Sequence, residues 1–246
     1  MIEKKIHYIW FGDEKPEKVK RCIESWNKNL KEYKIIEWNE SNLDIEELKK
    51  ENKFFKLCYE KKLWGVMTDY IRTKILYNEG GIYLDADVEV LKPFDELLDS
   101  DLFLGKEDEE NICYAVIGCT KNHKFLKHML DFYKDEVWKT PYFISTNIIE
   151  YVFKKYYTEE RIREERIREE KIKLYEKEYF YPYHWSEKFT NECIKPETLC
   201  IHRWEGSWTK NPNRVYLEYK HLNPILRFFK QNKKLLKLNI YRKIKK

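Results

Sequence analysis

The stretch WGVMTDYIRTKILYNEGGIYLDADVEV, residues 64–90, decides the fold, because it sets a helix, a glycine turn, a strand and two aspartates in direct succession. Apolar residues recur at helical spacing along residues 57–77, which predicts one long helix there. Gly80-Gly81 is the glycine C-cap expected at the end of that helix. Residues 82–84 form the apolar run of a buried strand, which leads straight into Asp85 and Asp87. In α/β sheets, ligands bind at the carboxyl ends of such strands.

Strands and helices alternate on both sides of this stretch. Before it we expect strands at residues 6–11 and 33–38 and helices at 16–30 and 44–52. After it we expect strands at 88–91, 102–104, 113–118 and 199–202 and a helix at 122–133. The alternation predicts an α/β fold with a single Rossmann-like, mostly parallel sheet flanked by helices, and with helical additions toward the C-terminus.

The composition is that of a globular protein, with 42% hydrophobic and 16% aromatic residues in 246. The six cysteines include no C-x-x-C pair and lie in segments that otherwise resemble core, so we expect reduced, mostly buried thiols. The N-terminus lacks the pattern of a signal peptide, and no stretch approaches 18 uncharged apolar residues. We therefore expect a cytoplasmic protein.

The basic charge is concentrated at the C-terminus. Residues 221–246 contain nine Lys or Arg and no Asp or Glu, interspersed with Leu, Ile and Phe. We expect residues 1–219 to form one domain and residues 220–246 to form a basic amphipathic helix or tail. Such a tail suits an anionic membrane surface, which would make the protein peripheral on the inner face of the plasma membrane. A plain solvated helix is the alternative, and binding of nucleic acid is not expected.

A charged repeat interrupts the second half of the chain. EERIR at residues 159–163 recurs at 164–168 and, as EEKIK, at 169–173. A period of five does not keep the isoleucines on one helical face, so the repeat is not a coiled-coil seam. We interpret it as an exposed, salt-bridged surface helix or as an extension of the preceding helix.

Asp85 and Asp87 are the residues on which the chemistry depends. Two aspartates separated by one residue at the end of a strand point to the same side of an extended chain, so both can reach one ion. Carboxylate oxygens suit Mg²⁺ or Mn²⁺, ions that also neutralise charge on a leaving diphosphate. A solvated acidic turn is the alternative, although the preceding strand and the Gly-Gly turn argue against it.

Three segments resemble one family. Residues 64–90, the opening strand IHYIWFG at residues 6–12, and IHRWEGSW at residues 201–208 are similar, in family order, to the DXD-containing retaining glycosyltransferases. That group includes the glycosyltransferase 32 family of capsular polysaccharide enzymes, the yeast-type initiating mannosyltransferases and the glucosyltransferase domains of clostridial toxins. The resemblance implies a fold of the GT-A type. Residues 140–195 match only loosely.

On the donor side, the resemblance implies roles for five residues. Asp87 would be the main metal ligand, and Asp85 would reach the metal through water or bind the donor. Tyr83 would help to hold the nucleotide, and Asp69 and Arg72, three residues apart on one helix, would hydrogen-bond the donor sugar. The alternative for Asp69 and Arg72 is a surface salt bridge.

Further roles come from the two ends of the matched region. Trp10 matches a tryptophan that stacks on the nucleotide base, although core packing would also explain it. His202 would be the third metal ligand, which favours Mn²⁺ over Mg²⁺, with a structural histidine as the alternative. Ser207 and Trp208 would belong to a loop that closes over the diphosphate. Arg203 stands where the family commonly has a second histidine, and we expect it to alter phosphate contacts. We assign no role to His7, His184 or Asn147, and residues 143–147 could contribute to acceptor binding.

The function implied is metal-dependent transfer of a sugar, with retention, from a nucleotide-diphosphate sugar to a saccharide or polyprenyl-linked saccharide acceptor in capsular or surface polysaccharide synthesis. UDP-sugar is the favoured donor and GDP-mannose its competitor. The alternatives are a protein-modifying glycosyltransferase of the toxin type and a non-catalytic nucleotide- or carbohydrate-binding module. No P-loop, dinucleotide fingerprint or nucleophile elbow is present in the sequence.

Overall fold

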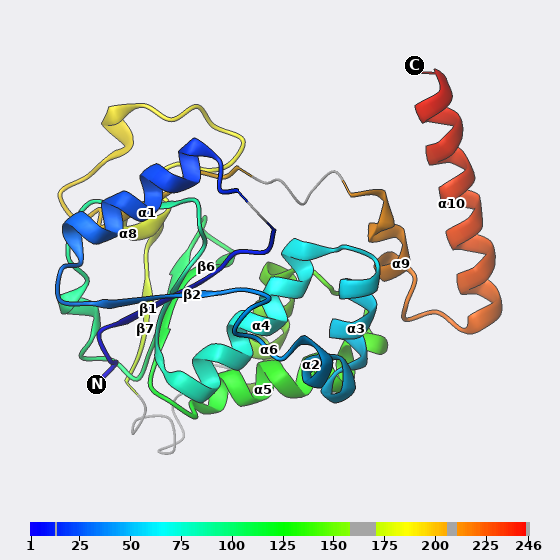
Figure 1. Cartoon of the computed structure of the whole chain (residues 1–246), viewed down its shortest axis with the longest axis horizontal. Helices are drawn as coiled ribbons and strands as arrows, with labels where there is room; N and C mark the ends of the chain where they lie inside the picture. Colours follow the sequence, from blue (N-terminus) through cyan, green and yellow to red (C-terminus); the bar gives the residue numbers. More distant parts are fainter. Residues whose placement is uncertain (13, 158–170, 206–210, 245–246) are drawn as a thin grey trace.

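The computed structural model describes residues 1–12, 14–157, 171–205 and 211–244. A six-stranded sheet in the order β2-β1-β3-β6-β5-β7 forms the centre, and β4 and β8 form a separate two-stranded sheet (Figure 1). The strands are β1 (Lys5–Ile9), β2 (Lys34–Trp38), β3 (Gly81–Leu84), β4 (Val88–Val90), β5 (Leu102–Lys106), β6 (Ile112–Cys119), β7 (Ile172–Tyr175) and β8 (Cys200–His202).

Most strand pairs of the central sheet are parallel. β1 runs parallel to β2 and β3, and β5 runs parallel to β7, while β6 is antiparallel to both β3 and β5. The α/β class and the mostly parallel sheet predicted from the sequence are therefore confirmed. β6 is the exception, because the short turn between β5 and β6 permits only antiparallel pairing.

The helices cover both faces of the sheet. Helix α1 (Glu17–Asn29) packs against β4 on one side, and α4 (Trp64–Glu79), α5 (Lys124–Lys134) and α6 (Ser145–Tyr156) lie on the other (Figure 1). Successive strand residues therefore enter different cores: Ile82 and Leu84 pack with the α1 side, and Tyr83 packs with the α4 side. This alternation decides which way the residues after β3 face.

The single helix expected over residues 57–77 is wrong, because two helices occupy this region. Helix α3 (Lys53–Glu60) begins at Asn52, whose side chain accepts a hydrogen bond from the backbone N–H of Phe55. The chain then turns at Lys62, whose φ of 54° lies outside the helical region, before α4 begins at Trp64. Apolar residues on both sides of the break keep helical spacing, so the periodicity conceals it.

The glycine turn after α4 is confirmed. Gly80 is the C-cap, with φ 65°, and its backbone N–H donates to the carbonyl of Leu76. A Cβ at this position would lie 2.9 Å from the backbone nitrogen of Lys121. Only glycine meets both conditions without strain, so the turn that delivers β3 to the sheet depends on it.

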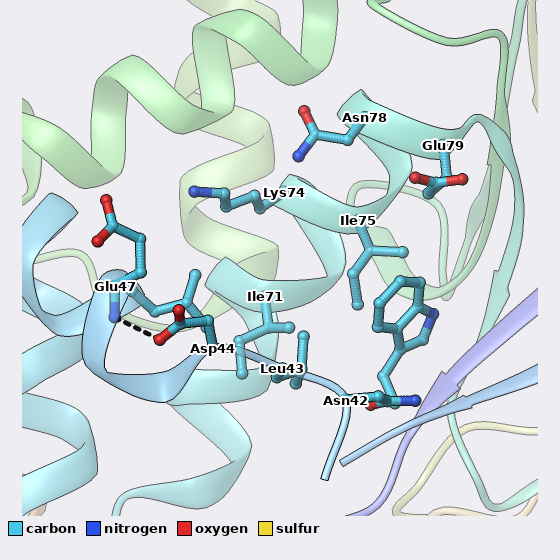
Figure 2. A pocket seen from close by; sticks show the side chains of 11 residues that line it. Asn42, Leu43, Asp44, Glu47, Ile71, Lys74, Ile75, Asn78 and Glu79 are labelled. Atoms are coloured by element: carbon cyan, nitrogen blue, oxygen red, sulfur yellow. Dashed lines mark hydrogen bonds between the residues drawn. The ribbon is translucent and has the colours of Figure 1, made fainter. Parts of the chain in front are cut away.

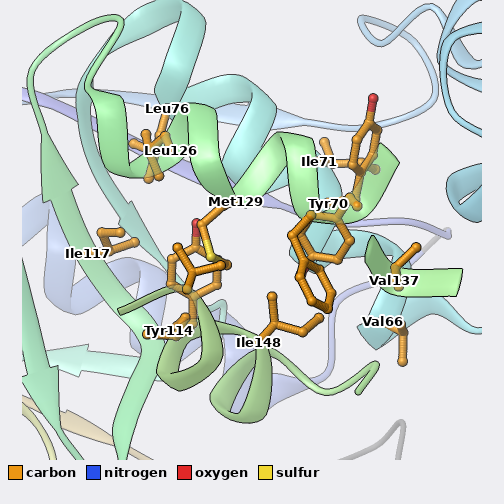
Figure 3. Close-up of a cluster of buried hydrophobic side chains, with 14 of the residues drawn as sticks. Val66, Tyr70, Ile71, Leu76, Tyr114, Ile117, Leu126, Met129, Val137 and Ile148 are labelled. Carbon is orange, nitrogen blue, oxygen red and sulfur yellow. The ribbon is translucent and has the colours of Figure 1, made fainter. Parts of the chain in front are cut away.

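The larger core lies between the sheet and helices α3 to α6. Figure 3 shows Tyr70, Leu76, Tyr114 and Met129 among its members, which come from helices and strands far apart in sequence. All six cysteines are free, and all but Cys193 are buried, as expected. Large aromatic residues are buried on both faces of the sheet, and their packing stabilises the carboxyl end of β3, next to Asp85.

The C-terminal part confirms some expectations and corrects one. Strand β8 and helix α10 (Pro224–Ile244) form as predicted. A short helix precedes each of them: α8 (Lys177–Phe180) lies before β8, and α9 (Val215–Glu218) lies before α10. The helix expected across the charged repeat is wrong at residues 172–173, which belong to β7 and pair with β5. Residues 159–170 lie outside the described residues. The remaining helix α2 (Ile45–Glu51) also forms as predicted.

Candidate active site

Asp85, Asp87 and His202 converge at the carboxyl end of β3. Each offers one ligand atom, and these atoms all lie within 4.8 Å of one another. Pairing of Val88 with His202 across β4 and β8 brings the histidine beside the two aspartates. The reason expected for the aspartates' proximity is wrong, however. They do not alternate along an extended strand but flank a turn, closed by the backbone N–H of Val88 donating to the carbonyl of Asp85 at 3.0 Å.

Asp87 is held from the β8 side. Its Oδ1 lies 3.2 Å from His202 Nε2, and its Oδ2 accepts a hydrogen bond from the backbone N–H of Glu205 at 2.9 Å. Burial opposes ionisation, but the imidazole of His202 lowers the pKa of Asp87 to about 2. Burial likewise disfavours the imidazolium, but the Asp87 carboxylate raises the pKa of His202 well above its usual value. The buried imidazole of His202 and the partly exposed carboxylate of Asp87 form an ion pair.

Two carboxylates and one imidazole make a donor set that fits a divalent cation of the Mn²⁺ or Mg²⁺ class. His202 is 7% exposed, and its Nδ1 has no hydrogen-bond partner among the described residues. A bound cation would take the place of the imidazole proton, since histidine binds metals in its neutral form.

Asp85 is held from the opposite side, by Arg72 on α4. The guanidinium lies 2.8 Å from Asp85 Oδ1 and 3.1 Å from Asp69 Oδ1, and it donates to the carbonyl of Tyr114. It also lies 4.5 Å above the ring of Tyr83. The alternative of a surface salt bridge is wrong, because Asp69 and Arg72 are only 6% and 5% exposed.

Asp69 is the buried carboxylate of this group, and its pKa is shifted. Burial, reinforced by the charge of Asp85, raises the pKa of Asp69 to about 7 despite the nearby guanidinium of Arg72. Ser145, the first residue of α6, acts in the opposite sense through hydrogen bonds from its hydroxyl and backbone N–H. Asp69 therefore lies between a cation and a helix N-terminus, and both favour its charged form.

Tyr83 and Trp10 occupy different positions. Tyr83 is 2% exposed, and its ring packs against the guanidinium of Arg72. The predicted role of Tyr83 in holding the nucleotide remains a prediction. Trp10 follows β1 and, like Ala86 and Trp204, is partly buried and packs against the core on the α1 side of the sheet. Its indole Nε1 is buried without a hydrogen-bond partner among the described residues. Trp10 thus combines core packing with an unused donor at the edge of the site.

The C-terminal motif is partly described. Ser207 and Trp208 lie outside the described residues. Arg203 does not point toward the triad: its Nε donates to Glu89 at 2.8 Å, and its guanidinium lies 4.4 Å from the ring of Phe189. The expectation that Arg203 alters phosphate contacts is therefore not supported by its position.

Sequence reasoning missed several residues around the triad. Trp204 packs on His202, with 4.1 Å between ring centroids, and Glu205 binds Asp87 through its backbone. Ser145 and Tyr114 hold Asp69 and Arg72. Trp204 and Glu205 lie in the family-like segment 201–208, and Ser145 lies in the segment 143–147, but neither segment indicated these contacts, which cross the fold.

A cavity of about 240 Å³ lies away from the triad, between α2 and α4, and its lining includes Leu43, Ile71 and Ile75 (Figure 2). A second cavity, of about 290 Å³, is lined by residues that include Asn52, Tyr70 and Lys134. Neither Asp85, Asp87 nor His202 lines either of these two cavities.

Comparisons with known proteins agree with this site. Residues 16–104 match the family model described as the glycosyltransferase sugar-binding region containing a DXD motif. The chain is 31% identical to inositol phosphoceramide mannosyltransferase 3 of Schizosaccharomyces pombe, over 51% of this chain and 35% of that protein. It is 28% identical to lactosylceramide 4-alpha-galactosyltransferase of Pongo pygmaeus, over 66% of this chain and 79% of that protein.

Among solved structures, the PaToxG glycosyltransferase superposes with a TM-score of 0.50 and 17% identity, covering 68% of this chain and 75% of that one. The GT-A type fold is therefore confirmed, as is the resemblance to the DXD-containing glycosyltransferases. The chain spans 24% to 38% of the length of three of the curated relatives that it matches.

Proposed function

We propose that this chain, which carries the sugar-binding region of the DXD-containing glycosyltransferases, transfers a sugar from a nucleotide-diphosphate sugar to a hydroxyl of a saccharide acceptor. The observation that carries the proposal is the convergence of Asp85, Asp87 and His202 next to the buried Arg72. A binding module would need no such combination of a cation site and an adjacent guanidinium. We place the reaction in capsular or surface polysaccharide synthesis.

In the proposed site, Asp87, Asp85 and His202 hold a divalent cation, which supplies positive charge to the departing diphosphate. Arg72 fixes Asp85 and Asp69 and faces the donor sugar. Trp10 takes the nucleotide base, with its free indole N–H as a hydrogen-bond donor. Mn²⁺ is the favoured ion because one ligand is an imidazole, and a UDP-sugar is the favoured donor.

We propose that transfer proceeds with retention at the anomeric carbon. The bond from that carbon to the diphosphate oxygen breaks, a bond to the acceptor oxygen forms, and the acceptor proton passes to an oxygen of the leaving diphosphate. Asp69, Asp85 and Asp87 each have protein partners already, in Arg72 and His202. None of the three is free to attack the sugar, which supports a route without an enzymatic nucleophile.

The test is a panel of UDP- and GDP-sugars, with and without Mn²⁺, measured by thermal stabilisation and by release of the nucleoside diphosphate. We expect stabilisation and release with a UDP-sugar plus Mn²⁺, and loss of both with EDTA or in Asp87→Asn. Asp131→Asn removes a surface carboxylate paired with Lys127 and serves as the matched control. Turnover that survives EDTA would exclude the metal role, and stabilisation without turnover would indicate a binding module.

We also propose that α10 holds the enzyme against an anionic membrane at its cytoplasmic face, where a polyprenyl-linked acceptor would lie. Figure 1 shows this helix beside the body of the protein. Two of its polar side chains contact the body: Gln231 donates to the carbonyl of Tyr216, and Lys234 pairs with Glu218. Apolar side chains of the helix lie in solvent beside its exposed lysines, with Phe228 64% and Phe229 65% exposed.

Exposed apolar side chains next to basic residues are typical of a helix that lies in a membrane interface. No described helix has the length and hydrophobicity needed to cross a membrane. Co-sedimentation with phosphatidylglycerol vesicles tests the proposal, with phosphatidylcholine vesicles as the comparison. Phe228→Ser with Phe229→Ser should abolish binding, whereas Trp185→Ser, which changes an equally exposed residue elsewhere, should not. Equal binding by all three proteins would contradict the proposal.

A further inference from the structure

An exposed tryptophan projects from a well-held turn next to the candidate active site. Trp185 is 64% exposed. The turn that carries it is fixed on both sides: the backbone N–H of His184 donates to Glu187 Oε2 at 2.8 Å, and His184 Nδ1 lies 2.6 Å from the hydroxyl of Ser186. An indole left in water on a pre-formed turn is a typical anchor for a ligand, because little freedom is lost on binding.

Aromatic rings connect this tryptophan to the triad. The ring of Trp185 lies 4.9 Å from that of His184, which lies 6.4 Å from Trp204, and Trp204 lies 4.1 Å from His202. Trp204 has a φ of 54°, an unusual conformation for an aromatic residue, and its Nε1 donates to the carbonyl of Tyr183 at 3.0 Å. Its packing and this hydrogen bond hold the strained conformation, and strain of this kind gathers at functional sites.

We propose that Trp185, His184 and Trp204 form the subsite for the acceptor saccharide; this rests on the proposed function. A pyranose ring presents an apolar face of C–H groups, and the exposed indole face of Trp185 packs against it. The row of rings ends at His202, so a sugar stacked on Trp185 lies on the side of the site that His202 occupies.

Binding can be measured without donor, metal or turnover. The intact chain is labelled with 5-fluorotryptophan and titrated, by fluorine NMR, with the methyl glycosides of glucose, galactose, mannose and N-acetylglucosamine up to tens of millimolar. Trp185→Phe assigns the Trp185 resonance, and the fully buried Trp26 serves as the internal reference. We expect saturable shifts of the Trp185 and Trp204 resonances with at least one glycoside. The absence of a Trp185 shift with all four would overturn the proposal.

Variants test the stacking contact. Trp185→Ala should weaken binding of the responding glycoside by about tenfold through the loss of the stacking ring. Phe228→Ala removes a ring of the same exposure far from the triad and should bind as the parent does. In turnover assays, Trp185→Ala should raise the KM for the acceptor by about tenfold and change the KM for the donor by much less. If the KM for the donor rises in parallel with that for the acceptor, Trp185 only supports His202 and the subsite is disproved. Failure of the parent to hydrolyse any donor would instead refute the proposed function.

Discussion

His7 should make the fold sensitive to mild acid. Its side chain is fully buried in β1, and both ring nitrogens are engaged: Nε2 lies 3.0 Å from the carbonyl of Gly80, and Nδ1 lies 3.0 Å from Trp38 Nε1. The indole N–H only donates, so Nδ1 must accept and therefore carries no proton. Nε2–H then donates to Gly80, and the ring is neutral. Protonation of Nδ1 would place its N–H next to the indole N–H of Trp38, so that two hydrogen-bond donors would face each other in a buried site.

The magnitude follows from the pKa. Burial lowers the pKa of His7 to about 4 from a usual 6.5. Between these values the unfolded chain binds a proton that the folded chain refuses, so stability falls as the pH falls. Neutral His7 contributes about 3 kcal/mol to the free energy of unfolding, and this contribution is complete above about pH 6.5. It is lost progressively toward pH 4, and about 2 kcal/mol of it is lost by pH 5.

Urea unfolding at about pH 7, 6 and 5 measures this loss. The informative variant is His7→Gln, whose amide can donate to Gly80 and accept from Trp38 but cannot titrate. The parent should lose about 2 kcal/mol more than His7→Gln between pH 7 and pH 5. His128→Gln, which changes a histidine stacked on Tyr156, controls for the removal of a titrating group elsewhere. Equal losses in the parent and in His7→Gln would refute the reasoning.

Three further predictions concern the site and its scaffold. Asp87→Asn should abolish the rise in melting temperature that Mn²⁺ produces in the parent, and an unchanged response in thermal-shift assays would argue against its role as a ligand. Arg72→Met leaves the buried Asp69 and the partly exposed Asp85 without their cation, so urea unfolding should show a loss of about 3 kcal/mol at pH 7, and a smaller loss near pH 5, where Asp69 binds a proton. Gly80→Ala places a Cβ at φ 65° and 2.9 Å from the Lys121 backbone, and should cost about 1–3 kcal/mol in the same assay; a neutral result would mean that the turn relaxes.

The parts of the fold that follow from local pattern were predictable. Residues 82–84 are apolar on both faces, and a strand with both faces buried has that composition. Gly80 has a positive φ that few other residues tolerate, so the end of α4 was also visible in the sequence. The break at Lys62 was not visible, because the residues on either side continue the helical spacing and only the backbone conformation departs from it.

The site was predictable as a set of residues but not as a set of contacts. His202 lies 115 residues after Asp87, and only family resemblance suggested the two as partners; the pairing of β4 with β8 brings them together. The Arg72–Asp85 bridge joins a helix face to a strand end, a relation that no sequence spacing encodes. The contact of Trp204 with His202 was not predicted, because it depends on a backbone conformation and a ring contact that the sequence does not indicate.

The two aspartates of the motif face opposite neighbours, and this separates their roles. Asp85 follows Tyr83 on the α4 side of the sheet and has one carboxylate oxygen 2.8 Å from the guanidinium of Arg72. Asp87 lies within the turn and faces His202. The imidazole of His202 would give up its proton if a cation bound. An oxygen that a buried arginine already holds is a poor direct ligand, whereas one paired with a displaceable proton is a good one. Asp87 is therefore the stronger candidate for direct ligation. In the proposed site, Asp85 would link the cation to Arg72 and through it to Asp69, so a donor that engages the guanidinium would also affect the geometry of the metal site.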